Sequence, residues 1–198
     1  MAACDVFMVF VDGKPGHEED YARWFLGGHL ADMRQLPGVT QAFSGHLTSL
    51  DGAASPAGLC ALYDTPDGGS LLKTIAASKG TAALPESDLQ GVMVWRVLET
   101  VGAVSTERVG DAQPGGPVLI CMCSDEIDGS LLPVLLDEHS DVKAARHMRI
   151  SPIQPSRGRE YSDFLLLDLE PGSDPADITS KLMSHVGSDA TRCLLVST

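Results

Sequence analysis

Basic residues are scarce in this chain of 198 residues, which has 14 Lys and Arg against 27 Asp and Glu and a formal charge of −13. Nucleic acids and anionic membranes are bound by dense basic surfaces, so we expect neither as the main partner. Apolar runs of about 20 residues, the length of a membrane-spanning helix, are also missing. The N-terminus lacks a basic segment and a clear cleavage site, so we expect no signal peptide and a cytoplasmic protein.

Motifs for common cofactors and metals are missing as well. No glycine-rich phosphate loop, dinucleotide fingerprint or Ser-His-Asp spacing stands out, which argues against flavin and nicotinamide. The five Cys are an odd number, which without a signal peptide favours free thiols in a reducing compartment. Cys121 and Cys123 share one strand face, but no further Cys or His stands at zinc-knuckle spacing. We therefore expect buried strand cysteines, no metal and no cofactor.

The order of the predicted elements favours an α+β fold with two similar halves. Within the first 100 residues the pattern is βαββαβ, the order of a ferredoxin-like fold. Strands are predicted at 4–11, 39–50, 58–64 and 92–100, and helices at 17–35 and 68–78. Thr65-Pro66-Asp67 is the start signal of the second helix. After a small, polar stretch the order starts again, with strands at 117–124, 142–153, 161–169 and 191–198 and helices near 131–139 and 174–186. We predict domains 1–100 and 117–198, joined by a linker at 101–116.

Short matches between the halves support a degenerate internal repeat. The segment WFLGGH at 24–29 resembles VLLDEH at 134–139, so His29 corresponds to His139. The second copy lacks several residues where the first has ADMRQLPG. We therefore expect any single site to lie in the first half, with the second half serving as the other wall of a barrel.

The most distinctive stretch is 19–47, read as an aromatic helix that Gly27-Gly28 interrupts, a Pro-Gly break and a strand. Trp24 and Phe25 belong to the apolar stripe of the helix, together with Tyr21, and His29 follows Phe25 by four residues. Asp32 stands three residues beyond His29, close enough on a helix to orient or charge the imidazole. Such a pair beside aromatic rings can act as a general base. The alternatives are a core His bonded to a carbonyl and a His that anchors the helix end.

This stretch resembles the first βαβ unit of EthD-like proteins of the dimeric α/β-barrel (ferredoxin-like) superfamily. The matching residues are Trp24-Phe25, His29-Leu30, Asp32 and Pro37-Gly38, within a region of about 5–50. The resemblance implies two antiparallel sheets packed as a barrel, here from tandem copies in one chain. It also implies chemistry on small molecules, because the superfamily includes cofactor-free monooxygenases, cyclases and isomerases as well as haem-binding enzymes.

Two further regions are candidates for binding. His46 shares a small, polar strand face with Thr40, Ala42, Ser44 and Thr48, a face that lines a ligand cavity or is simply solvated. Residues 142–159 carry five basic side chains, among them Arg146 and Arg149, and no acid. These basic side chains either bind an anionic ligand or belong to a strand and loop that pair with the acidic surface of a neighbouring domain or subunit.

Our first functional hypothesis is a cofactor-free isomerase, cyclase, lyase or monooxygenase acting on a hydrophobic or aromatic metabolite. Its general base is His29, oriented by Asp32. The substrate-binding residues are Tyr21, Trp24, Phe25, His46, Arg146 and Arg149. The alternatives are a non-catalytic ligand-binding or accessory protein and a protein that holds haem through His29 or His139. A homodimer is compatible with each of these.

Overall fold

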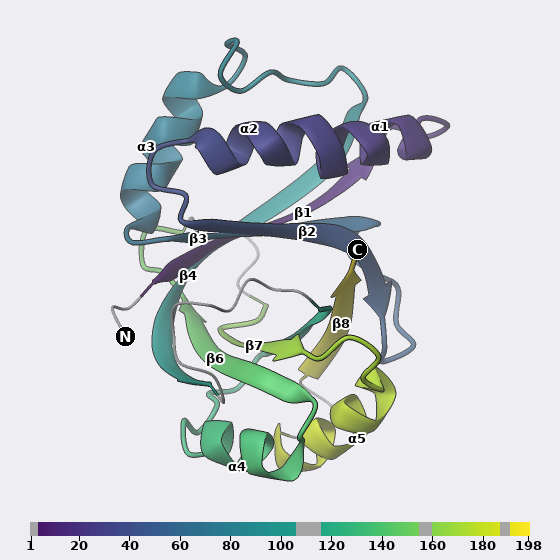
Figure 1. The fold of residues 1–198 in the computed structure, drawn as a ribbon, viewed down its shortest axis with the longest axis vertical. Helices are drawn as coiled ribbons and strands as arrows, with labels where there is room; N and C mark the ends of the chain where they lie inside the picture. The colour runs from purple at the N-terminus through teal and green to yellow at the C-terminus, as the bar shows by residue number, and fades with distance from the viewer. Residues whose placement is uncertain (1–3, 106–115, 155–159, 187–190) are drawn as a thin grey trace.

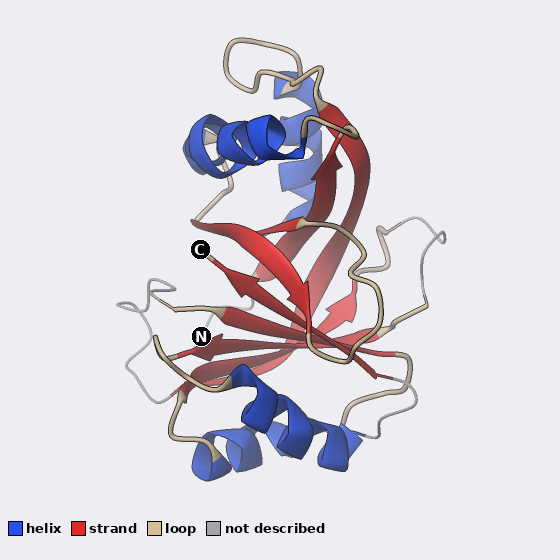
Figure 2. Cartoon of the chain, turned by 90° about the vertical axis from the view of Figure 1, so that its right-hand side faces the viewer, coloured by secondary structure: helices blue, strands red, loops and turns tan. Residues whose placement is uncertain are grey.

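The fold is that of a computed structural model, which describes residues 4–105, 116–154, 160–186 and 191–198. Most of the predicted linker, at 106–115, and two of the basic residues of the 142–159 region, Arg157 and Arg159, lie outside the described residues. The described part is a mixed α+β structure with an antiparallel barrel and two separate groups of helices (Figures 1 and 2).

The elements follow the predicted order. The strands are β1 (Asp5–Gly13), β2 (Gln41–Ser49), β3 (Leu59–Thr65), β4 (Gln90–Ser105), β5 (Val118–Cys123), β6 (Val142–Ile150), β7 (Asp163–Leu169) and β8 (Thr191–Ser197). The helices are α1 (Glu18–Trp24), the π-helical segment η1 (Phe25–His29), α2 (Leu30–Gln35), α3 (Gly68–Ser78), α4 (Leu131–Glu138) and α5 (Pro175–Val186). The Thr-Pro-Asp signal before α3 works as expected, because the Asp67 carboxylate accepts hydrogen bonds from the amides of Gly69 and Ser70.

The strands close into a barrel in the order β1-β3-β2-β8-β5-β7-β6-β4, and every neighbouring pair is antiparallel. Two pairings join the first half of the chain to the second. Strand β2 pairs with β8, and β4 pairs with β6. The halves therefore share one continuous sheet, which is the barrel-type arrangement expected from the sequence.

Hydrophobic side chains fill three layers. The barrel interior is packed with large apolar groups such as Met8, Leu98 and Phe164. A second core lies between the outer face of the first-half strands and α1 to α3, and a third lies between the second-half strands and α4 and α5. Figure 2 shows the two helix groups at opposite ends of the molecule, with the barrel between them. This arrangement explains why β1 and β5 are apolar on both faces, since each strand is covered on both sides.

One predicted boundary is wrong. We expected the fourth strand to end at Thr100, but β4 runs to Ser105, so the first five residues of the predicted linker belong to the sheet. After a register shift between Thr100 and Gly102, Gly102 to Ser105 pair with β6. This pairing partner lies about 40 residues further along the chain, so the small residues of 101–105 give no local sign of it.

The described helices also bear on membrane association: none is long and apolar enough to cross a bilayer.

Candidate functional site

The helix that carries the predicted catalytic pair changes geometry in its middle. α1 passes into the π-helical segment η1 at Phe25, and η1 passes into α2 after His29. Gly27 and Gly28, which we expected to interrupt the helix, lie inside this π segment and are exposed. A Cβ atom added at either glycine would meet nothing within 4 Å. Short π segments of this kind occur frequently at functional sites.

The widened turn brings His29 against two aromatic rings. Its ring centroid lies 4.6 Å from that of Trp24 and 5.4 Å from that of Phe25, to which it is nearly parallel at 20°. The Nδ1 atom of His29 is shielded from solvent and has no hydrogen-bond partner among the described residues. Burial lowers the pKa of His29, and the charge of Asp32 opposes this shift only in part. His29 is therefore a neutral imidazole at neutral pH, with one nitrogen unsatisfied.

The other aromatic residues of the helix pack towards the sheet. Tyr21 and Phe25 are almost fully buried in the core against β1 and β3, and Trp24 is half-buried beside them. Burial raises the pKa of Tyr21 to about 12, so its hydroxyl stays protonated. His46 lies apart from this cluster, exposed on β2 opposite Ser197 of β8.

Arg146 lies inside one end of the barrel. It shares the inward face of β6 with Met148, and its guanidinium donates to Asp64 of β3 at 2.8 Å. Because β3 and β6 are not neighbours in the sheet, the ion pair crosses the barrel. Burial lowers the pKa of Arg146, but the charges of Asp64 and Asp168 outweigh it and leave the pKa raised. The guanidinium that was a candidate for binding an anionic ligand thus pairs with a carboxylate of the chain itself, while its buried Nε has no hydrogen-bond partner among the described residues.

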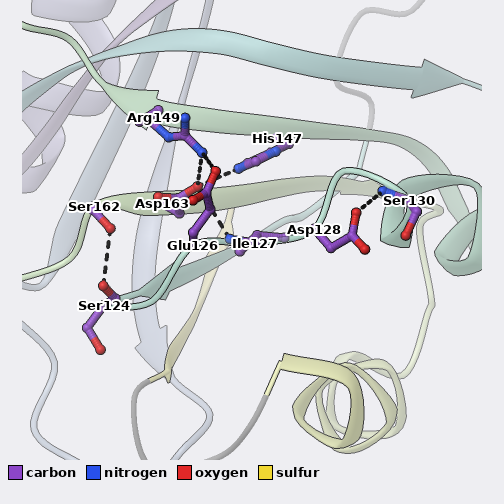
Figure 3. Close-up of polar contacts among 9 residues, drawn as sticks. All are labelled: Ser124, Glu126, Ile127, Asp128, Ser130, His147, Arg149, Ser162 and Asp163. Atoms are coloured by element: carbon purple, nitrogen blue, oxygen red, sulfur yellow. Dashed lines mark hydrogen bonds and ion pairs between the residues drawn. The ribbon is translucent and has the colours of Figure 1, made fainter.

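Arg149 belongs to a separate network on the outer face of the second half (Figure 3). Its guanidinium donates to Glu126 at 2.8 Å and to Asp163 at 3.2 Å. Asp163 also lies 2.6 Å from Nε2 of His147, and the side chains of both residues are 2% exposed. Because a carboxylate only accepts, the Nε2–H of His147 donates to it. Burial raises the pKa of Asp163, but the hydrogen bonds from His147 and Arg149 outweigh this effect and lower it.

A cavity of about 420 Å³ opens beside this network. It is formed by the β5–α4 loop, the start of α4 and the end of α5. Apolar side chains of Ile127, Leu131 and Val134 and the carboxylates of Asp125, Glu126 and Asp128 contribute to its lining. Glu126 connects the cavity to the network through Arg149. The described residues that line it include no Lys or Arg, so it suits an apolar molecule that carries a positive charge.

The His147–Asp163 contact was not predicted. The basic region around His147 was recognised in the sequence, and its alternation puts His147 and Arg149 on one strand face. Their partner is on the next strand, and identifying Asp163 requires the register Arg149↔Asp163 between β6 and β7. A hydrophobic pattern alone does not give that register.

Comparison with solved structures finds the same architecture over nearly the whole chain. A proposed monooxygenase from Lactobacillus acidophilus NCFM superposes with a TM-score of 0.56 at 11% identity, over 98% of this chain and 96% of that one. A proposed chlorite dismutase gives 0.55 at 10% identity, covering 100% and 96%. A haem-binding protein from Thermus thermophilus gives 0.52 at 15% identity, covering 100% and 91%.

The chain has the dimeric α/β-barrel fold. At these identities the likeness establishes the fold alone, and the structural neighbours differ in their stated activities. No protein-family model matches the chain, and no curated protein matches its sequence. The resemblance to EthD-like proteins therefore stays a prediction.

One structural neighbour is a haem-binding protein, so the described histidines of the second half are candidates for an axial haem ligand. An axial His must direct a free nitrogen into a slot wide enough for a flat macrocycle. Nε2 of His147 is held by Asp163. Nδ1 of His147 and Nε2 of His139 have no hydrogen-bond partner among the described residues, but both side chains are almost fully buried and face no open slot. The space between sheet and helices is closed by Leu135 and Leu182, both 0% exposed. His185 lines the cavity, but Glu138 holds its Nε2 at 3.1 Å. These residues do not fit a haem.

Proposed function

We propose that the protein is a cofactor-free enzyme that acts on a hydrophobic or aromatic metabolite, with His29 as general base. The observation that carries this proposal is the unsatisfied, buried Nδ1 of a neutral His29 that packs against the rings of Trp24 and Phe25. A lowered pKa keeps the imidazole unprotonated at neutral pH, the form that a general base needs. The fold is shared with proposed monooxygenases, which is compatible with this chemistry.

In this proposal each group has a separate task. Nδ1 of His29 takes a proton from an acidic C–H or O–H of the substrate. Asp32 is near enough for its charge to raise the pKa of His29, so it stabilises the imidazolium that forms. The ring of Trp24 provides a face on which a planar substrate stacks. Nδ1 is shielded from solvent, so substrate access requires the half-buried Trp24 ring to move.

Proton abstraction can be measured before the natural substrate is known. The protein is incubated in deuterated water with a panel of hydrophobic compounds that carry an acidic C–H, such as aryl β-ketoesters and unsaturated lactones. Deuterium incorporation is followed by mass spectrometry. We expect exchange above the buffer rate for part of the panel, and we expect H29A to lose it about a hundredfold or more.

The matched control is H17N, because His17 is an exposed histidine just before α1. It should exchange as fast as the wild-type protein. The exchange rate should also fall with acid through a midpoint below the ordinary His pKa of about 6.5, since burial lowers the pKa of His29. Full exchange by a folded H29A would show that His29 is not the base.

The cavity in the second half favours a second candidate, a ligand-binding protein without catalysis. Its apolar lining and its carboxylates suit an amine with an apolar tail. Calorimetric titration with hexylamine and hexanoate distinguishes the charge preference, and we expect binding of the amine alone.

A cavity-filling variant tests the location of that binding. V134W places a large ring in the lining of the cavity and should abolish amine binding. V92W adds the same ring at a position on β4 that is 66% exposed and lies outside the lining, so it should bind the amine normally. Equal amine binding by both variants would show that the amine binds outside this cavity.

We further propose that the two halves are tandem ferredoxin-like repeats, at 1–100 and 117–198, in a cytoplasmic protein that can form a homodimer. Around the barrel, the first half contributes strands in the order β4-β1-β3-β2 and the second half in the order β8-β5-β7-β6. In both halves the fourth strand is followed by the first, the third and the second, and this shared order supports the repeat. Assay of the oligomeric state by light scattering at several concentrations tests the dimer.

A further inference from the structure

Cys121 and Cys193 face each other directly on neighbouring strands. They are register partners in the antiparallel pair of β5 and β8, and their Sγ atoms are 3.2 Å apart without a bond between them. Both residues are 0% exposed. Two thiols at this distance are closer than most packed side-chain contacts, and in a reducing compartment they stay reduced.

The main-chain hydrogen bonds identify which kind of strand pair this is. The amide of Cys193 donates to Asp51 at 3.2 Å, and its carbonyl accepts from the amide of Leu50 at 2.9 Å. Both groups therefore point away from β5, so Cys121 and Cys193 form a non-hydrogen-bonded pair. Such pairs have Cα atoms about 4.5 Å apart and the closest side chains in an antiparallel sheet. Disulfides span Cα distances of about 4.4 to 6.8 Å.

We propose that Cys121 and Cys193 are a redox pair that forms a cross-strand disulfide when the protein meets a hydroperoxide. The sulfurs must approach each other by about 1.2 Å to reach the normal bond length of roughly 2.0 Å. The backbone already provides the required spacing, so this closure needs changes in the side-chain torsions rather than a shift of a strand.

The chemistry balances with the hydroperoxide as oxidant. One thiolate attacks an oxygen of the peroxide, the O–O bond breaks, and the sulfur becomes a sulfenic acid while an alcohol or water leaves. The second thiol attacks that sulfur, the S–S bond forms, and water leaves. The two sulfurs lose two electrons together, the peroxide gains them, and the two thiol protons end in the released alcohol and water.

Access for the oxidant is limited by α5. Sγ of Cys193 lies 3.8 Å from the sulfur of Met183, and the buried side chains of Ile178 and Leu182 complete the cover over the strands. Burial raises the pKa of the Cys121 thiol well above its ordinary value, which further slows attack. Oxidation therefore proceeds during local opening of α5 and is slow compared with that of an exposed thiol.

The test treats the full-length folded protein with hydrogen peroxide, blocks remaining thiols with iodoacetamide in denaturant, and maps peptides without reduction. We expect a mass loss of about 2 Da and a peptide link between Cys121 and Cys193, both reversed by dithiothreitol. Closing a loop of about 70 residues should raise Tm by roughly 5 to 15 °C.

Variants exclude other pairings. C121A and C193A should each abolish the link and the Tm rise, whereas C60A should keep both. Cys60 is the matched control because it is equally buried but lies in the barrel interior, away from the pair. The proposal is overturned if the wild-type protein remains reduced until it unfolds, or if the link that forms instead involves Cys123.

Discussion

Asp51 lies in the loop after β2 and binds residues of β8. The pairing of β2 with β8 is one of the two strand pairings that join the halves of the chain. Its carboxylate accepts hydrogen bonds from Nε of Arg192 at 2.5 Å, from the Ser49 hydroxyl at 2.6 Å and from the amides of Ala53 and Cys193. The side chain is only 9% exposed. Burial raises the pKa of Asp51, but these donors outweigh burial and lower the pKa to about 2.

This shift has a calculable effect on stability. The ordinary pKa is 3.8, and the folded value is about 2. Since one pKa unit corresponds to about 1.4 kcal/mol, the charged Asp51 stabilises the fold by about 2 kcal/mol near neutral pH. A group with a depressed folded pKa gives this stability above its unfolded pKa. The contribution is therefore lost as the pH falls from about 4 to about 2.

The perturbation is D51N, compared with the wild-type protein by urea unfolding followed by tryptophan fluorescence. We expect the free energy of unfolding to fall by about 2 kcal/mol at about pH 7, and the difference to disappear near pH 2. D20N is the control, because Asp20 forms an exposed ion pair with Arg23 on α1. Such a pair contributes about 0 to 1 kcal/mol. An unchanged difference between D51N and wild type across this pH range would refute the reasoning.

Two further predictions concern backbone space and the ion pair inside the barrel. G45A should destabilise the protein by several kcal/mol or prevent folding, because the new Cβ would clash with the carbonyl group of Ser197. G27A should be tolerated because its Cβ meets nothing within 4 Å, and thermal unfolding compares the two variants. R146M should cost about 1 to 3 kcal/mol near neutral pH, since it leaves the half-buried carboxylate of Asp64 without its partner. Adding D64N to R146M should recover part of that loss in a double-mutant cycle, and strictly additive losses would mean that the two groups are not coupled.

Sequence patterns predicted the helices and strands well, because the apolar runs and start signals that indicate an element lie within it or next to it in the chain. Short, continuous apolar runs marked β1 and β5, and the Thr-Pro-Asp sequence marked the start of α3 at its observed residue. The double glycine at 27 and 28 was recognised as an interruption of the helix. It could not be assigned a geometry, because a π turn and a simple bend have the same sequence signal.

The contacts that define the sites depend on distant pairings. Arg146 and Asp64 are 82 residues apart in the chain and meet across the barrel interior. Arg146 was predicted either to bind an anion or to pair with the acidic surface of a neighbouring domain or subunit, and in the structure it pairs with Asp64 of the first half. Arg149 also pairs with carboxylates, but both of them, Glu126 and Asp163, lie in its own half of the chain. Barrel closure fixes these partners, and closure is a property of the whole chain.

The two helix-covered faces of the barrel differ because their sheets present different side chains. The first half presents aromatic rings such as Phe7, Tyr63 and Trp95, which pack against one another and fill the space beneath α1 to α3. The second half presents small thiols and the Asp163 network beneath a shorter α4, and a cavity remains at the β5–α4 loop. The filled barrel interior separates the faces, so changes at His29 and at the cavity share no contacts. Their effects on stability should therefore add within about 0.5 kcal/mol in the H29A/V134W double variant. A larger coupling energy would mean that the barrel transmits strain between two faces that the packing keeps apart.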